Sequence, residues 1–389
     1  MVLFLHNRYR TTGGEERVVE DLMWLVREQL QEPVQLLSRS SAELGPGAAA
    51  LGLLRGGMAP RQVGEAVRAD GARVVHAHNL QPALGWRALA AARAAGARVV
   101  LHLHQYRLVC AIGVCFTRGA ECTRCHGRNT LPGVRLNCRD SVPEAAAYAA
   151  SLALWQRRMV DQADAFIVPS EFARERLRAL AAPLPWERVH TIAPPVRALA
   201  LEPRPPERAP DERTYALVVS RLAPEKGVDV AIDACRMAGV RLVIAGDGPE
   251  RAALQARARE LRAPAGASAA HASTEAVTFA GRVDEQELAR LRAGASLAIV
   301  PSRSAETFGL AAAEAMAAGL PVVASRAGAL GELLDERALV APGDADALAA
   351  AIGRLDGDAE QGARNHDRVR ALCAPGVVAD ALARVYDGA

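Results

Sequence analysis

Two glutamates in the last third of the chain have a type and spacing that could support chemistry. Glu306 lies in a loop after an apolar run, and Glu314 follows eight residues later, inside a predicted helix. Because the helix begins between them, core packing alone does not account for both carboxylates. The alternative to a functional pair is that one of the two glutamates caps the helix and the other is an ordinary surface residue. Four residues around the helix start would present backbone amides that favour an anion, namely Thr307, Phe308, Gly309 and Leu310.

A loop with two cations follows the predicted strand 216–219. It reads Ser220-Arg221-Leu222-Ala223-Pro224-Glu225-Lys226-Gly227 and leads into a helix. Arg221 could form a two-pronged hydrogen bond to a phosphate, and Lys226 could add a point charge. The loop therefore predicts a diphosphate site, with a solvated pair of cations as the alternative.

Two pairs of glycines also follow predicted strands. Gly13 and Gly14 open the first helix, where an anion would be favoured, and Gly246 and Gly248 would let a flat ring such as a nucleobase approach the backbone. Plain turns are the alternative at both places. Neither the GxGxxG nor the GxxxxGK[ST] pattern is present, which disfavours a dinucleotide site or a P-loop.

Five of the seven cysteines lie close together in the sequence. Their spacing is Cys110-x4-Cys115-x6-Cys122-x2-Cys125-x12-Cys138. A Cys-x2-Cys pair with flanking thiols is typical of zinc sites. Free buried thiols or redox-active cysteines are the alternatives.

Short apolar runs alternate with Ala/Leu/Arg-rich helical runs along most of the chain. Strands of this kind, separated by helices, indicate parallel sheets that are covered on both faces. The fold class we predict is α/β, with two Rossmann-like, doubly wound domains facing a cleft. Ligands of such sheets bind at the carboxyl ends of the strands, which is where these motifs lie.

Length and composition agree with two domains. The chain has 389 residues, of which 50% are hydrophobic and 23% charged, and its net charge of +3 does not predict a nucleic-acid binder. We place the first domain at 1–200 with a cysteine-rich insertion at 110–138, the second at 201–374, and a helix at 375–389 that packs back on the first. The proline-rich 203–211 is the expected linker, and the low-complexity 263–275 an expected surface loop. The apolar start reads as a strand rather than an export signal, so we expect a cytoplasmic protein.

The motifs together resemble the family-four (group 1) retaining glycosyltransferases, which have the GT-B fold. Glu306 and Glu314 match the E-x7-E signature of that family, and Ser220–Gly227 matches its S-R-L-x-x-x-K-G loop. Further segments in family order are Gly13-Gly14-Glu15, His76–Asn79, His104–Cys110, Gly246–Pro249, Phe279–Val283 and Gly319–Val322. The resemblance covers nearly the whole chain.

The resemblance implies a nucleotide-sugar donor, such as a UDP-, GDP- or dTDP-sugar, bound mainly by the second domain. Arg221 and Lys226 would bind the diphosphate and Glu314 the ribose hydroxyls. Glu306 and the amides of 307–310 would bind the sugar, and His104 would contact it at the reaction centre. The glycine loop at Gly13 and Gly14 would lie near the phosphates or the acceptor.

The resemblance also bears on metals. It implies that four cysteines hold a structural zinc, namely Cys110, Cys122, Cys125 and Cys138. Cys115 would be an extra thiol. No catalytic metal is expected. The Asp344-Ala345-Asp346 pattern opens a predicted helix, so we interpret it as a helix cap.

The implied function is sugar transfer to a hydroxyl acceptor with retention of configuration, in polysaccharide, glycan or glycosylated-metabolite biosynthesis. The acceptor could be a small metabolite or a lipid-linked molecule, since 141–159 could form an amphipathic helix that contacts a membrane peripherally; ordinary core packing is the alternative. A same-fold sugar-nucleotide epimerase or phosphorylase-like enzyme is the second hypothesis. A zinc-stapled interaction protein without catalysis is the third.

Overall fold

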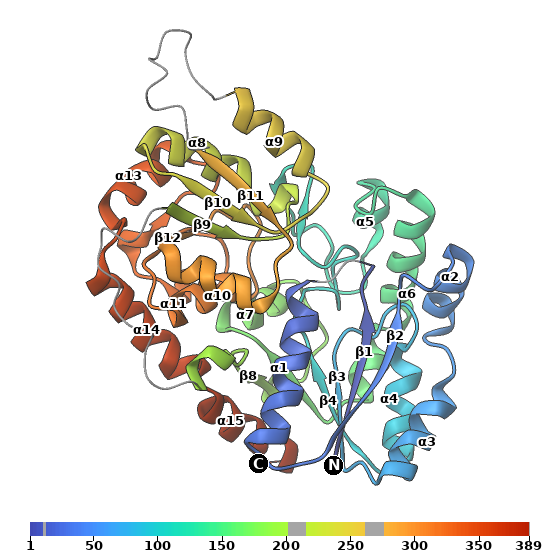
Figure 1. Ribbon diagram of the computed structural model, residues 1–389. Coiled ribbons are helices and arrows are strands. Elements are labelled where there is room, and N and C mark those ends of the chain that lie inside the picture. Colours follow the sequence, from blue (N-terminus) through green and yellow to red (C-terminus); the bar gives the residue numbers. More distant parts are fainter. Residues whose placement is uncertain (11–12, 201–214, 261–275, 389) are drawn as a thin grey trace. The chain divides into compact units, whose positions relative to one another are not determined.

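The computed structural model describes residues 1–10, 13–200, 215–260 and 276–388 (Figure 1). They form two compact units, the first made of Met1–Pro195 and the C-terminal helix α15 (Pro375–Asp387), the second of Val196–Ala374. The expected linker 203–211 and the expected loop 263–275 both fall entirely outside the described residues. Thr11 and Thr12, which precede the first glycine pair, fall outside them as well.

A six-stranded parallel sheet forms the centre of the first unit, in the order β2-β1-β3-β4-β7-β8. Its strands are β1 (Val2–Arg8), β2 (Val34–Ser40), β3 (Val74–Ala77), β4 (Arg98–His102), β7 (Ala165–Val168) and β8 (Val189–Thr191). The apolar start of the chain forms β1, as predicted. The sequence did not reveal β8, because this three-residue edge strand has no apolar run.

Helices cover both faces of this sheet (Figure 1). On one side lie α1 (Gly14–Glu28) and α15, and on the other α3 (Pro60–Asp70), α4 (Gly85–Ala94) and α6 (Val142–Asp161), with α2 (Pro46–Arg55) against α6. The remaining long helix is α7 (Glu171–Ala179). Burial on both faces explains why β1 begins with four successive apolar residues that are 0% exposed, Val2 to Leu5.

The C-terminal helix α15 is tied to the first unit by polar contacts. The hydroxyl of Tyr386 lies 2.7 Å from Nδ1 of His76. Arg98 donates a hydrogen bond from Nε to the carbonyl of Val385 at 2.9 Å. The last helix therefore belongs to the core of the first sheet, although the second unit separates it from that sheet in sequence.

The second unit has its own six-stranded parallel sheet, in the order β11-β10-β9-β12-β13-β14. Its strands are β9 (Tyr215–Val219), β10 (Leu242–Ala245), β11 (Val277–Gly281), β12 (Ala295–Val300), β13 (Val322–Ser325) and β14 (Leu339–Val340). Its helices are α8 (Val228–Ala238), α9 (Arg251–Glu260), α10 (Glu285–Gly294), α11 (Leu310–Ala317), α12 (Leu330–Leu333), α13 (Ala345–Leu355) and α14 (Ala359–Cys373). The two sheets confirm the predicted α/β class with two doubly wound domains.

The segment between β4 and α6 has little regular structure. It contains a hairpin of β5 (Phe116–Thr117) and β6 (Ala120–Glu121) and one short helix, α5 (Leu131–Arg135). This is the predicted cysteine-rich insertion. Within the described ranges, no helix is long and apolar enough to cross a lipid bilayer.

Candidate active site

The loops after β9 and β12 lie where the strand order of the second sheet changes direction. β9 pairs with β10 on one side and with β12 on the other. In doubly wound sheets this arrangement opens a crevice at the carboxyl ends of the two central strands, and ligands bind there. The loop 220–227 follows β9, and Glu306 follows β12, so the two charged motifs share this position.

Lys226 and Glu306 form an ion pair between these two loops. The Nζ atom of Lys226 lies 2.7 Å from Oε1 of Glu306, and the hydroxyl of Ser302 donates to the same oxygen at 2.5 Å. Burial opposes the ionisation of Glu306, but the charge of Lys226 and the hydrogen bonds from Lys226 and Ser302 outweigh it and lower the pKa of Glu306. An ionised carboxylate thus lies beside an ammonium group.

Arg221 lies on the same loop and forms a different pair. Its guanidinium hydrogen bonds to Glu225, and its side chain is 45% exposed. The loop then closes into a short 3-10 helix, Pro224–Lys226, before α8 begins. The two predicted phosphate-binding cations therefore both contact carboxylates, and Arg221 is the more accessible of the two.

Close backbone packing requires glycine at positions 246 and 248, in addition to any role in ligand binding that we predicted. A Cβ atom at Gly246 would lie 1.8 Å from the carbonyl oxygen of Ser220, and one at Gly248 would lie 2.3 Å from that of Leu222. Gly246 also has a φ of +143°. The glycines thus let the loop after β10 pack against the backbone of the loop after β9, which fixes the position of the loop that carries the cations.

Glu314 is buried in an ion pair that the sequence did not suggest. Its carboxylate contacts the guanidinium of Arg292 at the end of α10, and the two side chains are only 9% and 11% exposed. A buried carboxylate of this kind is oriented by its cation and keeps little freedom to rotate.

The start of α11 depends on Gly309. This residue caps the helix with a φ of +99°, and a Cβ atom there would lie 2.6 Å from Cδ2 of Leu330. Phe308 is buried beside it, and the carbonyl of Glu306 accepts a hydrogen bond from the amide of Ala329 at 2.9 Å. The segment 306–310 is therefore fixed at both ends, as a preorganised group of amides requires.

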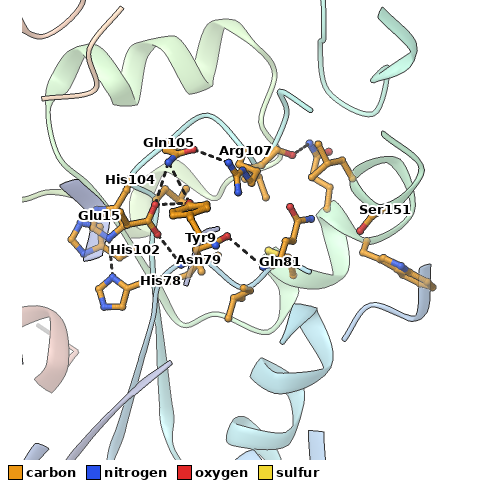
Figure 2. A pocket seen from close by; sticks show the side chains of 18 residues that line it. Tyr9, Glu15, His78, Asn79, Gln81, His102, His104, Gln105, Arg107 and Ser151 are labelled. Atoms are coloured by element: carbon orange, nitrogen blue, oxygen red, sulfur yellow. Dashed lines mark hydrogen bonds between the residues drawn. The ribbon is translucent and has the colours of Figure 1, made fainter. Parts of the chain in front are cut away.

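The first unit has a cavity of about 60 Å³ near the ends of β3 and β4, which we name the β3–β4 cavity (Figure 2). The strand order of the first sheet changes direction between β1 and β3, so this is again the expected place for a ligand. Its polar lining comes from segments after β1, β3 and β4 and from α6, and includes Tyr9, Glu15, His78, Asn79, Gln81, His102, His104, Gln105, Arg107 and Ser151.

Glu15 is the acidic centre of the β3–β4 cavity (Figure 2). It accepts hydrogen bonds from the hydroxyl of Tyr9 at 2.6 Å, the amide of Asn79 at 3.1 Å and the side chain of Gln105 at 3.3 Å. Burial raises the pKa of Glu15, and the hydrogen bond from Tyr9 only partly opposes this. Arg107 stacks 4.9 Å above the ring of Tyr9, so one phenol contacts a cation through its ring and a carboxyl group through its hydroxyl.

The predicted glycine loop forms the beginning of α1. Gly13 caps the helix in an extended conformation, and its amide donates to Oε2 of Glu16 at 2.8 Å. The other oxygen of Glu16 accepts from the amide of Tyr9 at 3.1 Å. Glu16 therefore joins the end of β1 to the start of α1, and Gly14 is the first residue of that helix.

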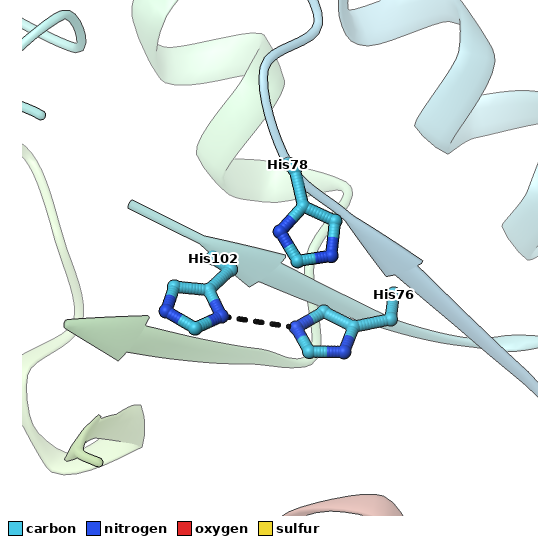
Figure 3. A group of neighbouring side chains, drawn as sticks. All are labelled: His76, His78 and His102. Carbon is cyan, nitrogen blue, oxygen red and sulfur yellow. Dashed lines mark hydrogen bonds between the residues drawn. The ribbon is translucent and has the colours of Figure 1, made fainter. Parts of the chain in front are cut away.

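Three buried histidines meet between β3 and β4 (Figure 3). Nitrogen atoms of His76, His78 and His102 lie within 4.8 Å of one another. His76 and His102 lie edge to edge, inclined by 9°, with Nε2 of His76 3.2 Å from Nδ1 of His102, whereas His76 and His78 stack with their centroids 4.4 Å apart. A metal ion requires lone pairs, which lie in the ring planes, to converge on one point. Here two facing nitrogens bond to each other and the third ring lies face to face with His76, so the arrangement favours packing. His104 continues the stack, with its centroid 4.0 Å from that of His102.

Burial keeps these imidazoles neutral. It is the main cause that lowers the pKa of His76 and of His104 to about 3, and it also lowers the pKa of His78 and His102 well below the ordinary value. His104 hydrogen bonds to His78 at 2.8 Å and lines the β3–β4 cavity. It therefore presents an uncharged ring to a ligand.

The aspartate pair is a helix cap, as predicted. Oδ1 of Asp344 accepts a hydrogen bond from the amide of Ala347 at 2.8 Å at the start of α13.

Tyr9, Arg107 and Arg292 were not singled out as site residues by the sequence. Tyr9 and Arg107 lie within a few residues of the ends of β1 and β4, and that position was a usable signal. Arg292 gave no signal, because only the tertiary fold brings it to Glu314.

Two family models match the chain. The model described as "Glycosyl transferase 4-like domain" matches residues 13–195, and the one described as "Glycosyl transferases group 1" matches residues 213–358. The first falls in the first unit and the second in the second unit.

Curated relatives match part of the chain. A glycogen synthase of Mycobacterium tuberculosis is 38% identical over 157 residues, which are 38% of this chain and 34% of that protein. A D-inositol 3-phosphate glycosyltransferase of Mycobacterium sp. (strain KMS) is 35% identical over 194 residues, 46% of this chain and 40% of that protein. The matches thus span less than half of the relatives' own length.

Solved structures match the whole chain. Anabaena HepE in complex with UDP and glucose has a TM-score of 0.65 at 19% identity and full coverage of both chains (100%). Sucrose-phosphate synthase from Thermosynechococcus elongatus has a TM-score of 0.66 at 20% identity, covering 100% of this chain and 98% of that one. Their likeness shows the fold. With two family models placed on two doubly wound units, the chain belongs to the group 1 glycosyltransferases of GT-B type.

Proposed function

We propose that this chain transfers a sugar from a nucleotide-diphosphate sugar to a hydroxyl group, with retention of the anomeric configuration. The observation that carries the proposal is the Lys226–Glu306 ion pair at the switch point of the second sheet. It places a phosphate-binding cation beside a carboxylate that can accept hydrogen bonds from sugar hydroxyls. The complexes of HepE with UDP-glucose and with UDP and glucose support a nucleotide-sugar donor.

On the donor side, Arg221 and Lys226 bind the diphosphate. Negative charge grows on this leaving group as the glycosidic bond breaks, so cations placed here stabilise the transition state more than the ground state. When a phosphate engages Lys226, Glu306 becomes available to the sugar together with the amides of 307–310. Glu314 binds the ribose hydroxyls, and Arg292 holds it in position.

Retention follows from attack on the face that the diphosphate leaves. The bond between the anomeric carbon and the phosphate oxygen breaks through an oxocarbenium-like state, and the acceptor oxygen forms its bond on the same side. The acceptor proton passes to the departing phosphate. This route needs no carboxylate nucleophile, unlike retaining glycosidases.

The β3–β4 cavity of the first unit suits a hydroxyl-rich acceptor. Glu15 and Gln105 offer acceptors and donors of hydrogen bonds, and neutral His104 contacts the transferred sugar. An uncharged imidazole suits this position, because a positive ring would repel the oxocarbenium-like centre.

A lipid-linked acceptor with peripheral membrane contact is a narrower form of the proposal. The packed helices α2 and α6 expose Leu51, Leu54, Val142 and Leu154, each between 44% and 55%. Arg157 and Arg158 lie on α6, and cations near apolar side chains favour an anionic membrane surface. Co-sedimentation with anionic vesicles, lost in Leu51→Ser/Leu54→Ser and kept in a neutral surface variant, would support it.

A donor panel tests the main proposal. UDP-, GDP- and dTDP-sugars are screened by thermal shift, since a ligand that binds the folded state raises Tm. The binding donor is then incubated with hydroxyl acceptors, and NMR of the product reports the anomeric configuration. An altered sugar nucleotide formed without acceptor would instead indicate an epimerase. No donor-induced shift would favour an interaction protein and contradict the proposal.

A further inference from the structure

Five cysteines that are spread over the insertion line a single small cavity. Its volume is about 10 Å³, roughly the space of one water or one ion. The thiols that line it are Cys110, Cys115, Cys122, Cys125 and Cys138. None of them forms a disulfide. We name this space the cysteine cavity.

Backbone hydrogen bonds bring the thiols together from three parts of the insertion. The amide of Cys122 donates to the carbonyl of Cys115 at 2.7 Å, which closes the β5–β6 hairpin. The amide of Cys138 donates to the carbonyl of Gly133 at 3.0 Å, after α5. Cys110 begins the insertion, and its amide donates to the backbone carbonyl of Tyr106 at 2.8 Å. The convergence is thus a property of the fold and not of sequence proximity.

The insertion lacks the regular structure that would keep it folded by itself. Its strands have two residues each, and α5 has five. Hairpins and helices this short are not stable in isolation. A link among the converging thiols would supply the missing restraint.

The surroundings of the thiols suit thiolates bound to a metal. Backbone amides of Ile112, Gly113 and Cys115 hydrogen bond to the sulfur of Cys110. A Cβ atom at Gly133 would lie 2.7 Å from Cβ of Ala111 and 3.8 Å from the sulfur of Cys125, so a larger residue would crowd this wall of the cavity. Amide donors aimed at sulfur stabilise negative charge there, as hydrogen bonds to the ligands do in metal sites.

We propose that Cys110, Cys122, Cys125 and Cys138 bind one structural Zn²⁺ in the cysteine cavity, with Cys115 as an extra thiol in its wall. Four thiolates in a closed tetrahedral site favour zinc and leave no open position for catalysis. Cys115 contacts Cys110 through its side chain, so it supports that ligand without being one.

Metal binding would tighten the insertion. Among the described residues, the stacked histidines are the only group of three or more ligand atoms within 4.8 Å of one another. Zinc–sulfur bonds of about 2.3 Å would therefore draw the cysteine sulfurs closer than they now lie. Binding and ordering of the insertion would then be coupled, as in other structural zinc sites.

The proposed site is joined to the β3–β4 cavity. Arg107, which lines that cavity, contacts the carbonyl of Ile112 at 3.5 Å, and the amide of Tyr106 donates to the carbonyl of Gly113 at 2.9 Å. The turn that carries Cys110 therefore also holds Arg107 in place. Loss of zinc should loosen the first-unit cavity and leave the second unit unchanged.

Elemental analysis of the full chain, purified under reducing conditions, tests the proposal. We expect about one zinc per chain, near zero in Cys122→Ser and Cys138→Ser, and about one in Cys115→Ala. Cys235→Ser is the control, because this thiol lies on α8, outside the insertion, and is buried. Zinc near zero after reconstitution of the unmodified chain, or disulfides among the four cysteines by mass spectrometry, would overturn the site. Zinc lost from Cys115→Ala but kept in Cys138→Ser would overturn the ligand choice.

A spectroscopic measurement covers the case in which the serine variants do not fold. Co²⁺ added to the metal-free unmodified chain should give the absorption of a tetrahedral cobalt thiolate, saturating at about one equivalent. Octahedral cobalt spectra would contradict the proposal. Neither readout uses a sugar, so the site and the transferase function can fail independently.

Discussion

The Nζ atom of Lys226 lies 2.7 Å from Oε1 of Glu306, although 80 residues separate them in sequence. They meet because β9 and β12 are neighbours in the sheet and both loops leave at their carboxyl ends. The pair gives Lys226 a fixed place before any ligand binds. A cation that is already positioned stabilises developing charge without reorganising during the reaction.

Lys226→Ala should lower both donor affinity and turnover. Removal of one electrostatic stabiliser typically costs ~10²–10³-fold in rate. Isothermal titration with the donor and steady-state kinetics measure the two effects. Arg326→Ala is the control, because Arg326 forms an exposed ion pair with Glu336. If Lys226→Ala stays within a factor of two of the parent while the control behaves the same, the loop is not the phosphate site.

Glu314→Gln should reduce stability as well as donor binding. Breaking a buried ion pair leaves Arg292 without its counter-charge, at a cost of about 3–5 kcal/mol. The double variant Arg292→Met/Glu314→Leu removes both charges and should recover most of the stability, as measured by urea unfolding, but not donor affinity. Recovery of donor affinity as well would show that Glu314 has no part in binding.

The stacked histidines predict that the folded state loses stability in mild acid. Burial lowers the pKa of His76 and His104 to about 3, whereas in the unfolded chain it is ~6.5. Between these values the unfolded chain binds protons that the folded chain excludes, so the free energy of unfolding falls as pH falls from 6.5. The loss is about 2 kcal/mol per histidine at pH ~5.

Urea unfolding between neutral pH and mild acid measures this loss. His76→Phe should make the pH dependence shallower by about one proton, because it removes one titrating group. His126→Gln changes an exposed imidazole outside the stack and serves as the control. A free energy of unfolding that does not change over this range would mean that the histidines are not buried as a neutral stack.

Turnover should not require added Mg²⁺ or Mn²⁺. Arg221, Lys226 and the start of α11 supply the positive charge that a divalent ion gives to a diphosphate elsewhere. Assays with and without these ions, after brief chelation, measure this. Activity that is abolished by the chelator and restored by Mn²⁺ but not by Zn²⁺ would contradict the assignment.

Much of the architecture was readable from the sequence. Apolar runs such as Val2–Leu5 predicted buried parallel strands, because a strand covered on both faces has no polar side. Lys226 and Glu306 were singled out because each lies in a loop after a predicted strand, and Glu314 because it follows Glu306 by eight residues. Asp344 was assigned as a cap from its place at a helix start, and its hydrogen bond to Ala347 confirms this.

The tertiary structure determined which residues far apart in the sequence contact one another. The pairs Lys226–Glu306 and Arg292–Glu314 depend on strand order and helix placement, which local patterns do not encode. The return of Tyr386 to His76 spans 310 residues. A Cβ atom at Gly246 would meet the carbonyl oxygen of Ser220, a contact that the sequence did not reveal. The sequence by itself determined which residues carry charge and where elements begin, because these follow from side-chain chemistry and local periodicity. Contacts between distant segments follow from how the sheets are assembled, and only the folded chain contains them.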